Sequence, residues 1–109
     1  MPSSRGDVVR STDPFKYGLE RQRPWLVVNN DRHTFAAEQY VAVAITNKSY
    51  ATSIPLENPV WEISGVPADS DVSPWAVHSP RAEDFDHWQG RVLSSFVEDV
   101  IDRLEALLR

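Results

Sequence analysis

The residues from Tyr40 to Thr46 constrain the fold more than any other part of this chain. They form a run, Tyr-Val-Ala-Val-Ala-Ile-Thr, that is rich in β-branched residues and contains no charge. Such residues favour strands, and an apolar run without polar alternation is typical of a strand buried on both faces. The sequence therefore predicts a central strand here, with other elements covering both of its faces.

Further short segments, separated by turn residues, also have the composition of strands. Pro24 precedes one of them, and we expect Pro74 to place part of another at a sheet edge, because proline cannot donate to a ladder. Residues 80–90 are charged and predict irregular structure, with one helical turn at Arg81–Phe85. The predicted strands are Gly6–Ser11, Trp25–Val28, Ser53–Leu56, Val60–Ile63, Val72–Val77 and Arg91–Leu93.

The end of the chain predicts a helix that packs on this sheet. Ser95 and Glu98 have the spacing of a capping box, in which the two side chains bind the first free backbone N–H groups. Apolar residues then recur at helical spacing as far as Leu108, which predicts a single buried stripe. Five to seven short strands followed by one helix predict a mostly-β fold, a small SH3-like barrel.

Length and composition narrow the class of protein. With 109 residues we expect one domain, 5–109, preceded by a flexible tail, 1–4. There is no cysteine, no apolar run long enough to cross a membrane and no signal-peptide pattern at the start, so we expect a cytoplasmic protein. The three histidines have no short metal-ligand spacing, and we expect neither a metal nor a cofactor.

The charge is distributed unevenly along the chain. The net charge is −5, yet residues 1–56 hold seven basic and five acidic residues, whereas residues 57–109 hold four and eleven. A mildly basic first half can bind a polyanion while the acidic half faces elsewhere.

The chain has no Gly-rich phosphate loop and none of the common hydrolase motifs. The acidic pairs Glu83-Asp84 and Asp69/Asp71 read as solvated charge. What remains is a polar cluster at the ends of two central strands, where Arg23 stands at the junction between a loop and a strand and Thr46 closes the next strand. Cations, amides and a hydroxyl of this kind bind phosphodiesters. The other members of the cluster are Glu20, Arg21, Gln22, Asn47 and Lys48.

Two residues of the segment near Pro74 leave alternatives open. Trp75 either stacks on an unpaired base or fills the core. His78 either exchanges a proton with a substrate near neutral pH or is structural.

Four motifs in order resemble the MazF/PemK family of toxins from toxin–antitoxin systems. They are Arg5-Gly6-Asp7-Val8-Val9, a charged loop with Gly18 and Glu20, the run Arg23-Pro24-Trp25-Leu26-Val27-Val28-Asn29-Asn30-Asp31, and Val43-Ala44-Ile45-Thr46. The resemblance implies a homodimeric SH3-like barrel, a metal-independent endoribonuclease that cuts single-stranded mRNA at short sequences, and a cognate antitoxin. It also implies that Arg23 and Thr46 are catalytic.

Physical chemistry supports part of that assignment. Cleavage through the 2′-hydroxyl needs a base, an acid and stabilisation of a highly charged phosphorane. Arg23 suits the last role, since a guanidinium matches phosphate oxygens and stays charged, and Thr46 can hydrogen-bond a non-bridging oxygen. Glu20 or His78 could carry the proton. We expect Arg21, Gln22, Asn47, Lys48 and Trp75 to contact the substrate.

Two other functions are compatible with the same barrel. The related CcdB-type toxins use it without enzymatic activity, to bind DNA gyrase. An inactive nucleic-acid-binding domain would bind RNA with a steep salt dependence and leave it uncut.

Overall fold

The computed structural model describes residues 4–12, 22–64 and 70–109, in which seven strands form one antiparallel sheet and one α-helix follows. The strands are β1 (Asp7–Thr12), β2 (Gln22–Val27), β3 (Ala42–Thr46), β4 (Ile54–Pro55), β5 (Trp61–Ser64), β6 (Asp71–His78) and β7 (His87–Val92). The helix is α1 (Ser94–Leu108), and two 3₁₀ turns, η1 (Asn58–Val60) and η2 (Ala82–Asp84), lie between strands.

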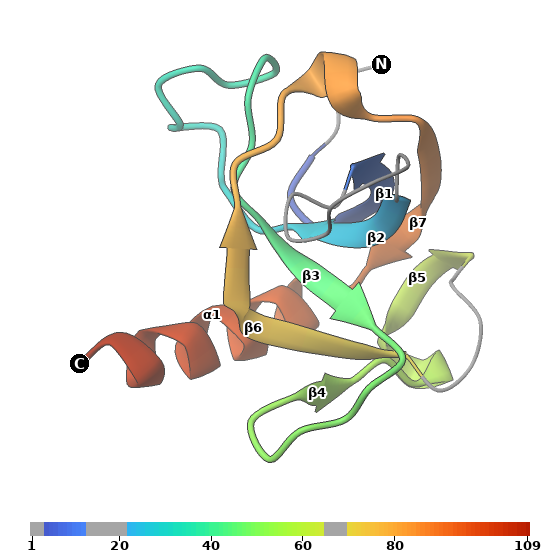
Figure 1. Ribbon diagram of the computed structural model, residues 1–109, viewed down its shortest axis with the longest axis vertical. Coiled ribbons are helices and arrows are strands. Elements are labelled where there is room, and N and C mark those ends of the chain that lie inside the picture. The colour runs from blue at the N-terminus through green and yellow to red at the C-terminus, as the bar shows by residue number, and fades with distance from the viewer. Residues whose placement is uncertain (1–3, 13–21, 65–69) are drawn as a thin grey trace.

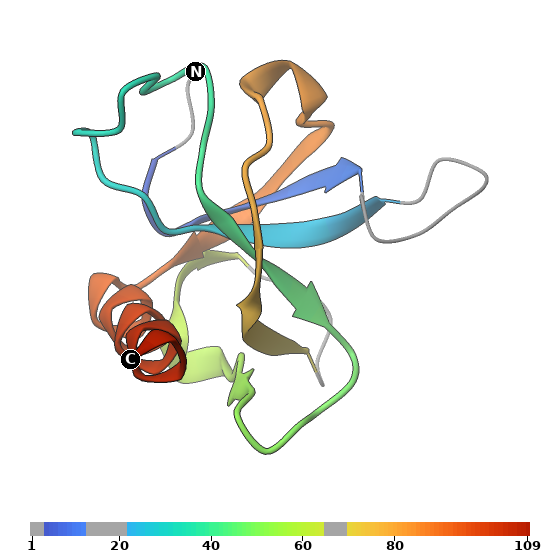
Figure 2. The ribbon, with the colours of Figure 1, turned by 60° about the vertical axis from the view of Figure 1, so that its left-hand side comes forward.

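The sheet curls into a half-barrel with α1 against one side (Figure 1). Its strand order is β4-β6-β3-β2-β1-β7-β5, so β3 and β2 are central and the short β4 and β5 are the edges. Figure 2 looks nearly along α1 and shows the helix beside the curved strands. The predicted mostly-β barrel with a C-terminal helix is confirmed.

Both faces of β3 are buried, as predicted. Val43 and Ile45 belong to a core cluster that includes Phe96, Val97 and further residues from the sheet and α1. Ala42 and Ala44 belong to a second cluster, with Trp25 and Tyr40, to which residues of the β6–β7 connection add their side chains. Burying a large apolar side chain contributes about 1.5–3 kcal/mol, so the position of β3 is determined from two sides.

Most predicted strand boundaries differ from the structure by one or two residues, and two strands begin three or more residues before the predicted start. β2 begins at Gln22 rather than at Trp25, because β1 pairs with it as far as Thr12↔Gln22. Arg23 therefore lies inside a strand and not at a junction with a loop. β7 begins at His87, within residues predicted to be irregular, because β1 pairs with it as far as Arg10↔His87, whereas β5 pairs only with its last three residues. The polar residues of β7 show no strand pattern in the sequence, so this strand is explained only by its pairing with β1 and β5.

Strand β6 contains a wide bulge. Its register against β3 jumps from Val43↔Val77 to Ala44↔Ser73, which leaves residues 74–76 without partners on β3. β4 pairs only with Val72 and Asp71, so Pro74 stands where the ladder of β4 has ended. A proline, which lacks an N–H group, is tolerated both in a bulge and beyond the end of a ladder.

The predicted capping box does not form. The helix begins at Ser94 with Leu93 as its N-cap, and no side chain caps it. This start places Ser95 inside the first turn and Glu98 beyond the position from which it could bind the N-cap. Glu98 instead accepts a hydrogen bond from Arg5 at 2.6 Å.

The apolar stripe of α1 is only partly buried. Phe96, Val97 and Val100 are buried, as the periodicity predicted, whereas Leu107 and Leu108 are exposed. The sheet ends before the last helical turn reaches it. None of the helices in the part of the chain that the structure describes has the length and apolar composition that a membrane crossing requires.

A buried ion pair joins the first and last strands. Asp7 pairs with Arg91 across β1 and β7, and its Oδ1 accepts from Arg91 Nε at 2.7 Å. Its Oδ2 accepts from the Ser4 amide, also at 2.7 Å. The hydrogen bond to Asp7, followed by the charge of Asp7, raises the pKa of the Arg91 guanidinium. The Asp7 side chain is only 4% exposed, so removing it leaves two donors unpaired.

We expect Asp7→Ala to lower the free energy of unfolding by about 1.5–3 kcal/mol, the range for hydrogen bonds to charged groups. Chemical denaturation measures this change. Glu83→Ala is the control, because its ion pair with Arg81 lies between side chains that are 72% and 70% exposed. Exposed pairs contribute less than about 1 kcal/mol. Equal effects of the two variants would contradict the role of Asp7.

Candidate active site

Arg23 and Thr46 face each other across the two central strands. β2 and β3 are antiparallel, with Trp25↔Ala44 as the last pair toward this end. Continuing that register by two residues brings Arg23 opposite Thr46. Residues directly opposite in an antiparallel pair project to the same face of the sheet. The side chains of Arg23 and Thr46 therefore share one face, the face of Trp25 and Ala44.

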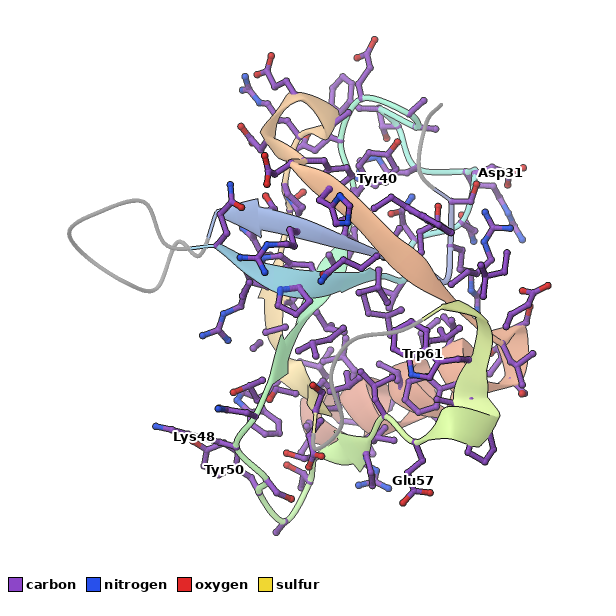
Figure 3. All side chains as sticks on the ribbon, turned by 90° about the vertical axis from the view of Figure 1, so that its right-hand side faces the viewer. Asp31, Tyr40, Lys48, Tyr50, Glu57 and Trp61 are labelled. Atoms are coloured by element: carbon purple, nitrogen blue, oxygen red, sulfur yellow. The ribbon has the colours of Figure 1, made fainter. Side chains whose placement is uncertain are left out.

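This end of the sheet holds a groove of about 700 Å³. Six of the residues predicted to act on a substrate line it, and two further side chains, Tyr50 and Ser73, complete its polar and aromatic lining. Figure 3 shows Lys48 and Tyr50 together on the connection that follows β3. The six predicted residues are Gln22, Arg23, Thr46, Asn47, Lys48 and Trp75.

The Thr46 hydroxyl is held by the turn that follows it. The backbone N–H of Lys48 donates to Thr46 Oγ1 at 3.3 Å. A hydroxyl that accepts one hydrogen bond keeps its own proton for donation. Thr46 can therefore donate to an oxygen atom of a ligand in the groove.

A second hydroxyl flanks Arg23 from the other side. Ser11 pairs with Arg23 in the β1–β2 ladder, so their side chains project to one face. Ser11 is 1% exposed, and among the described residues its Oγ has no hydrogen-bond partner. Arg23 thus lies between the hydroxyl-bearing residues of two neighbouring strands.

The structure does not place the other three predicted site residues in the lining of the groove in the same way, because two of them are outside the described residues. Glu20 and Arg21 lie outside the residues that the structure describes. His78 packs its ring on Trp25, with 5.1 Å between centroids, at the far end of β6, where it pairs with Ala42. Because Trp25 shares the face of Arg23, His78 is on the same side of the sheet as the groove.

Three other residues near the groove were not predicted as site residues. Tyr50 follows the predicted cluster by two positions, and Ser73 precedes Pro74 in a segment noted for Trp75. Their contribution depends on strand pairing, which local pattern does not reveal. Asp71 was interpreted as solvated charge, but it is only 9% exposed and pairs with Thr46 across β3 and β6. It places a carboxylate on the strand next to the Thr46 hydroxyl.

The arrangement suits an anionic ligand rather than a metal ion. Within residues 4–12, 22–64 and 70–109, no group of three or more His, Asp or Glu is placed to hold a metal. The groove instead has a guanidinium, an ammonium, an amide and hydroxyls, which are the side chains that contact phosphates in nucleic-acid complexes.

Comparisons with known proteins bear on the fold. No protein-family model and no curated protein matches the chain. A chain of a MazE–MazF crystal structure from Deinococcus radiodurans matches with a TM-score of 0.76 and 16% identity, covering 99% of this chain and 97% of that one. An endoribonuclease in complex with its cognate antitoxin, from a mycobacterial species, gives 0.65 and 22%, covering 97% and 91%. The Mycobacterium tuberculosis toxin MazF-mt6 gives 0.70 and 15%, covering 94% and 95%.

These matches span nearly the whole of each chain. At such identities they establish a common architecture, so the chain has the fold of the MazF toxins, which the resemblance in its sequence predicted.

Proposed function

We propose that the chain is the toxin of a type II toxin–antitoxin system, an endoribonuclease that cleaves single-stranded mRNA at short sequences and so arrests translation and growth. The observation that carries this proposal is that Arg23 and Thr46, from the two central strands, line one groove. The structural neighbours that are named endoribonucleases or MazF toxins support it through their common fold.

Arg23 has the role of stabilising charge on the phosphate. When the 2′-hydroxyl attacks phosphorus, negative charge builds on the non-bridging oxygens, and the 5′-oxygen leaves as the cyclic phosphate forms. A guanidinium presents a planar fork of donors that matches these oxygens and remains charged at any working pH. The backbone of Arg23 is held by its pairing with Ser11 of β1, so it loses little backbone freedom on binding.

Thr46 donates a hydrogen bond from its hydroxyl to a non-bridging oxygen, while the backbone N–H of Lys48 holds Thr46 Oγ1 in place. Lys48 and Arg23 bind neighbouring phosphates along the groove. The proton from the 2′-hydroxyl goes to a base, for which Glu20 and His78 are the candidates from the sequence. Asp71, which pairs with Thr46, is a further candidate. None of these steps requires a metal ion.

The proposed assembly follows the same family pattern. The toxin forms a homodimer in the cytoplasm, and the antitoxin from the same operon covers the RNA groove. The structural neighbours that support an antitoxin partner are the Deinococcus radiodurans MazE–MazF crystal structure and the mycobacterial endoribonuclease in complex with its cognate antitoxin.

Cleavage of single-stranded RNA in the presence of EDTA tests the proposal through Arg23 and Thr46. We expect Arg23→Ala to lower kcat/KM by about 10²–10³-fold, the effect of removing one donor that stabilises a transition-state oxyanion. Arg23→Lys keeps the charge but lacks the planar fork of donors, so its kcat/KM should lie between those of the wild type and Arg23→Ala. Thr46→Val should lose activity that Thr46→Ser retains, because serine restores the hydroxyl.

The matched control is Arg81→Ala, since Arg81 is an exposed arginine that does not line the groove. It should cleave RNA at the wild-type rate. Circular dichroism and thermal unfolding check that each variant is folded. Wild-type rates for Arg23→Ala would refute the assignment, and RNA that binds but stays uncut would favour the inactive-barrel alternative.

Lys48 gives a separate electrostatic prediction. Each phosphate neutralised on a single strand contributes about 0.7 to the slope of log K against log salt. Lys48→Ala should therefore reduce that slope by about 0.7, measured by binding of an RNA whose 2′-hydroxyls are methylated to prevent cleavage. Arg32→Ala, at an exposed position outside the groove, should leave the slope unchanged.

A further inference from the structure

Two aromatic side chains meet on the groove that Arg23 and Lys48 also line. The rings of Tyr50 and Trp75 are 5.7 Å apart between centroids and inclined by 81°, an edge-to-face contact. Both residues line the groove, and they remain 53% and 42% exposed. A single exposed aromatic residue needs no explanation, but two that pack together on a polar groove leave an apolar surface facing water.

The bulge of β6 places Trp75 in this position. Residues 74–76 have no partner on β3, and within this bulge Pro74 is buried whereas Trp75 is exposed. The first four residues of β6 are all buried, so the exposure of Trp75 begins where the pairing is interrupted. Trp75 therefore does not fill the core, and this excludes the core-filling alternative that the sequence left open.

A closed turn holds Tyr50. Its backbone N–H donates to Ser53 Oγ at 3.0 Å, and the Ser53 N–H donates to the Tyr50 carbonyl, also at 3.0 Å. Tyr50 lies two residues beyond Lys48, whose amide binds Thr46 Oγ1. Tyr50 is therefore close in sequence to Lys48 and Thr46, the residues that would bind the phosphate.

We propose that Tyr50 and Trp75 form a stacking wall for an unpaired base of the RNA whose neighbouring phosphates Arg23 and Lys48 bind. A nucleotide has two parts, a charged phosphate and a planar base, and the groove is lined by both cations and aromatic rings. Single-strand binders combine these two elements, because every base has a face that stacks on an aromatic ring. The inference rests on the function proposed above and specifies its substrate.

The volume fits this substrate. Sites of roughly 300–1,000 Å³ enclose small ligands, and a groove of about 700 Å³ is large enough for a short stretch of single-stranded RNA. A paired base would keep its faces stacked within the helix and could not reach the rings. The wall therefore selects unpaired RNA.

Binding of two non-cleavable probes tests the wall separately from catalysis. One is a short oligoadenylate whose 2′-hydroxyls are methylated, and the other is the same backbone without bases. We expect the wild type to prefer the probe with bases by about 5- to 150-fold, the range that stacking of one base supplies. Trp75→Ala and Tyr50→Ala should each lose most of this preference and bind the abasic backbone as the wild type does.

Trp88→Ala is the matched control, since Trp88 is 43% exposed on β7 and does not line the groove. It should keep the full preference. The oligoadenylate should also quench tryptophan fluorescence in the wild type and in Trp88→Phe but not in Trp75→Phe. Tyr50 lies in a turn and Trp75 in a bulge, so the two alanine variants are separate tests. If one variant fails to fold, the other still tests the wall.

The inference is overturned if both alanine variants keep the wild-type preference for the probe with bases. It is also overturned if they weaken binding to both probes equally, because that result assigns Tyr50 and Trp75 a structural role. A wild type that shows the preference but never cuts RNA refutes the proposed nuclease and leaves the wall intact. A wild type that cuts RNA, together with alanine variants that keep the preference, refutes only the wall.

Discussion

The burial of β3 on both faces is the constraint on which the site depends. A strand that is buried on one side can slip if its alternating pattern is weak. A one-residue slip of β3 would instead place Val43 and Ile45 in the core cluster that Ala42 and Ala44 occupy, and the alanines in the other cluster. The register against β2 is therefore fixed. That register brings Arg23 opposite Thr46, so the packing of the core determines the distance between the two polar groups.

The groove separates two kinds of recognition within a small area. Strands β2 and β3 present the guanidinium and the hydroxyl from regular, paired backbone, whereas Tyr50 and Trp75 come from a turn and a bulge. Groups that must be placed accurately for chemistry stand on the rigid ladders. Groups that only need to offer a flat apolar face stand on irregular backbone. Among the described residues no Asp or Glu lines the groove, although Asp71 lies opposite Thr46 on the neighbouring strand.

The sequence predicted this site unevenly. Arg23 and Thr46 could be found because a long apolar strand and a motif order marked them, and Lys48 follows directly in the chain. The start of β7 at His87 and the burial of Asp71 could not be found, because both depend on partners distant in sequence. The capping box failed for a different reason. Its spacing was correct, but the helix began at Ser94 and moved both residues out of the capping positions.

The bulge of β6 has an evolutionary consequence. Since the pairs Val43↔Val77 and Ala44↔Ser73 close the ladder on either side of it, a substitution at Trp75 alters the surface of the groove without disturbing the register that the core requires. If Trp75 recognises the ligand as proposed, stability and recognition are encoded by separate residues of one strand. A lineage of such proteins could diverge in what it recognises while each member kept the same framework beneath it.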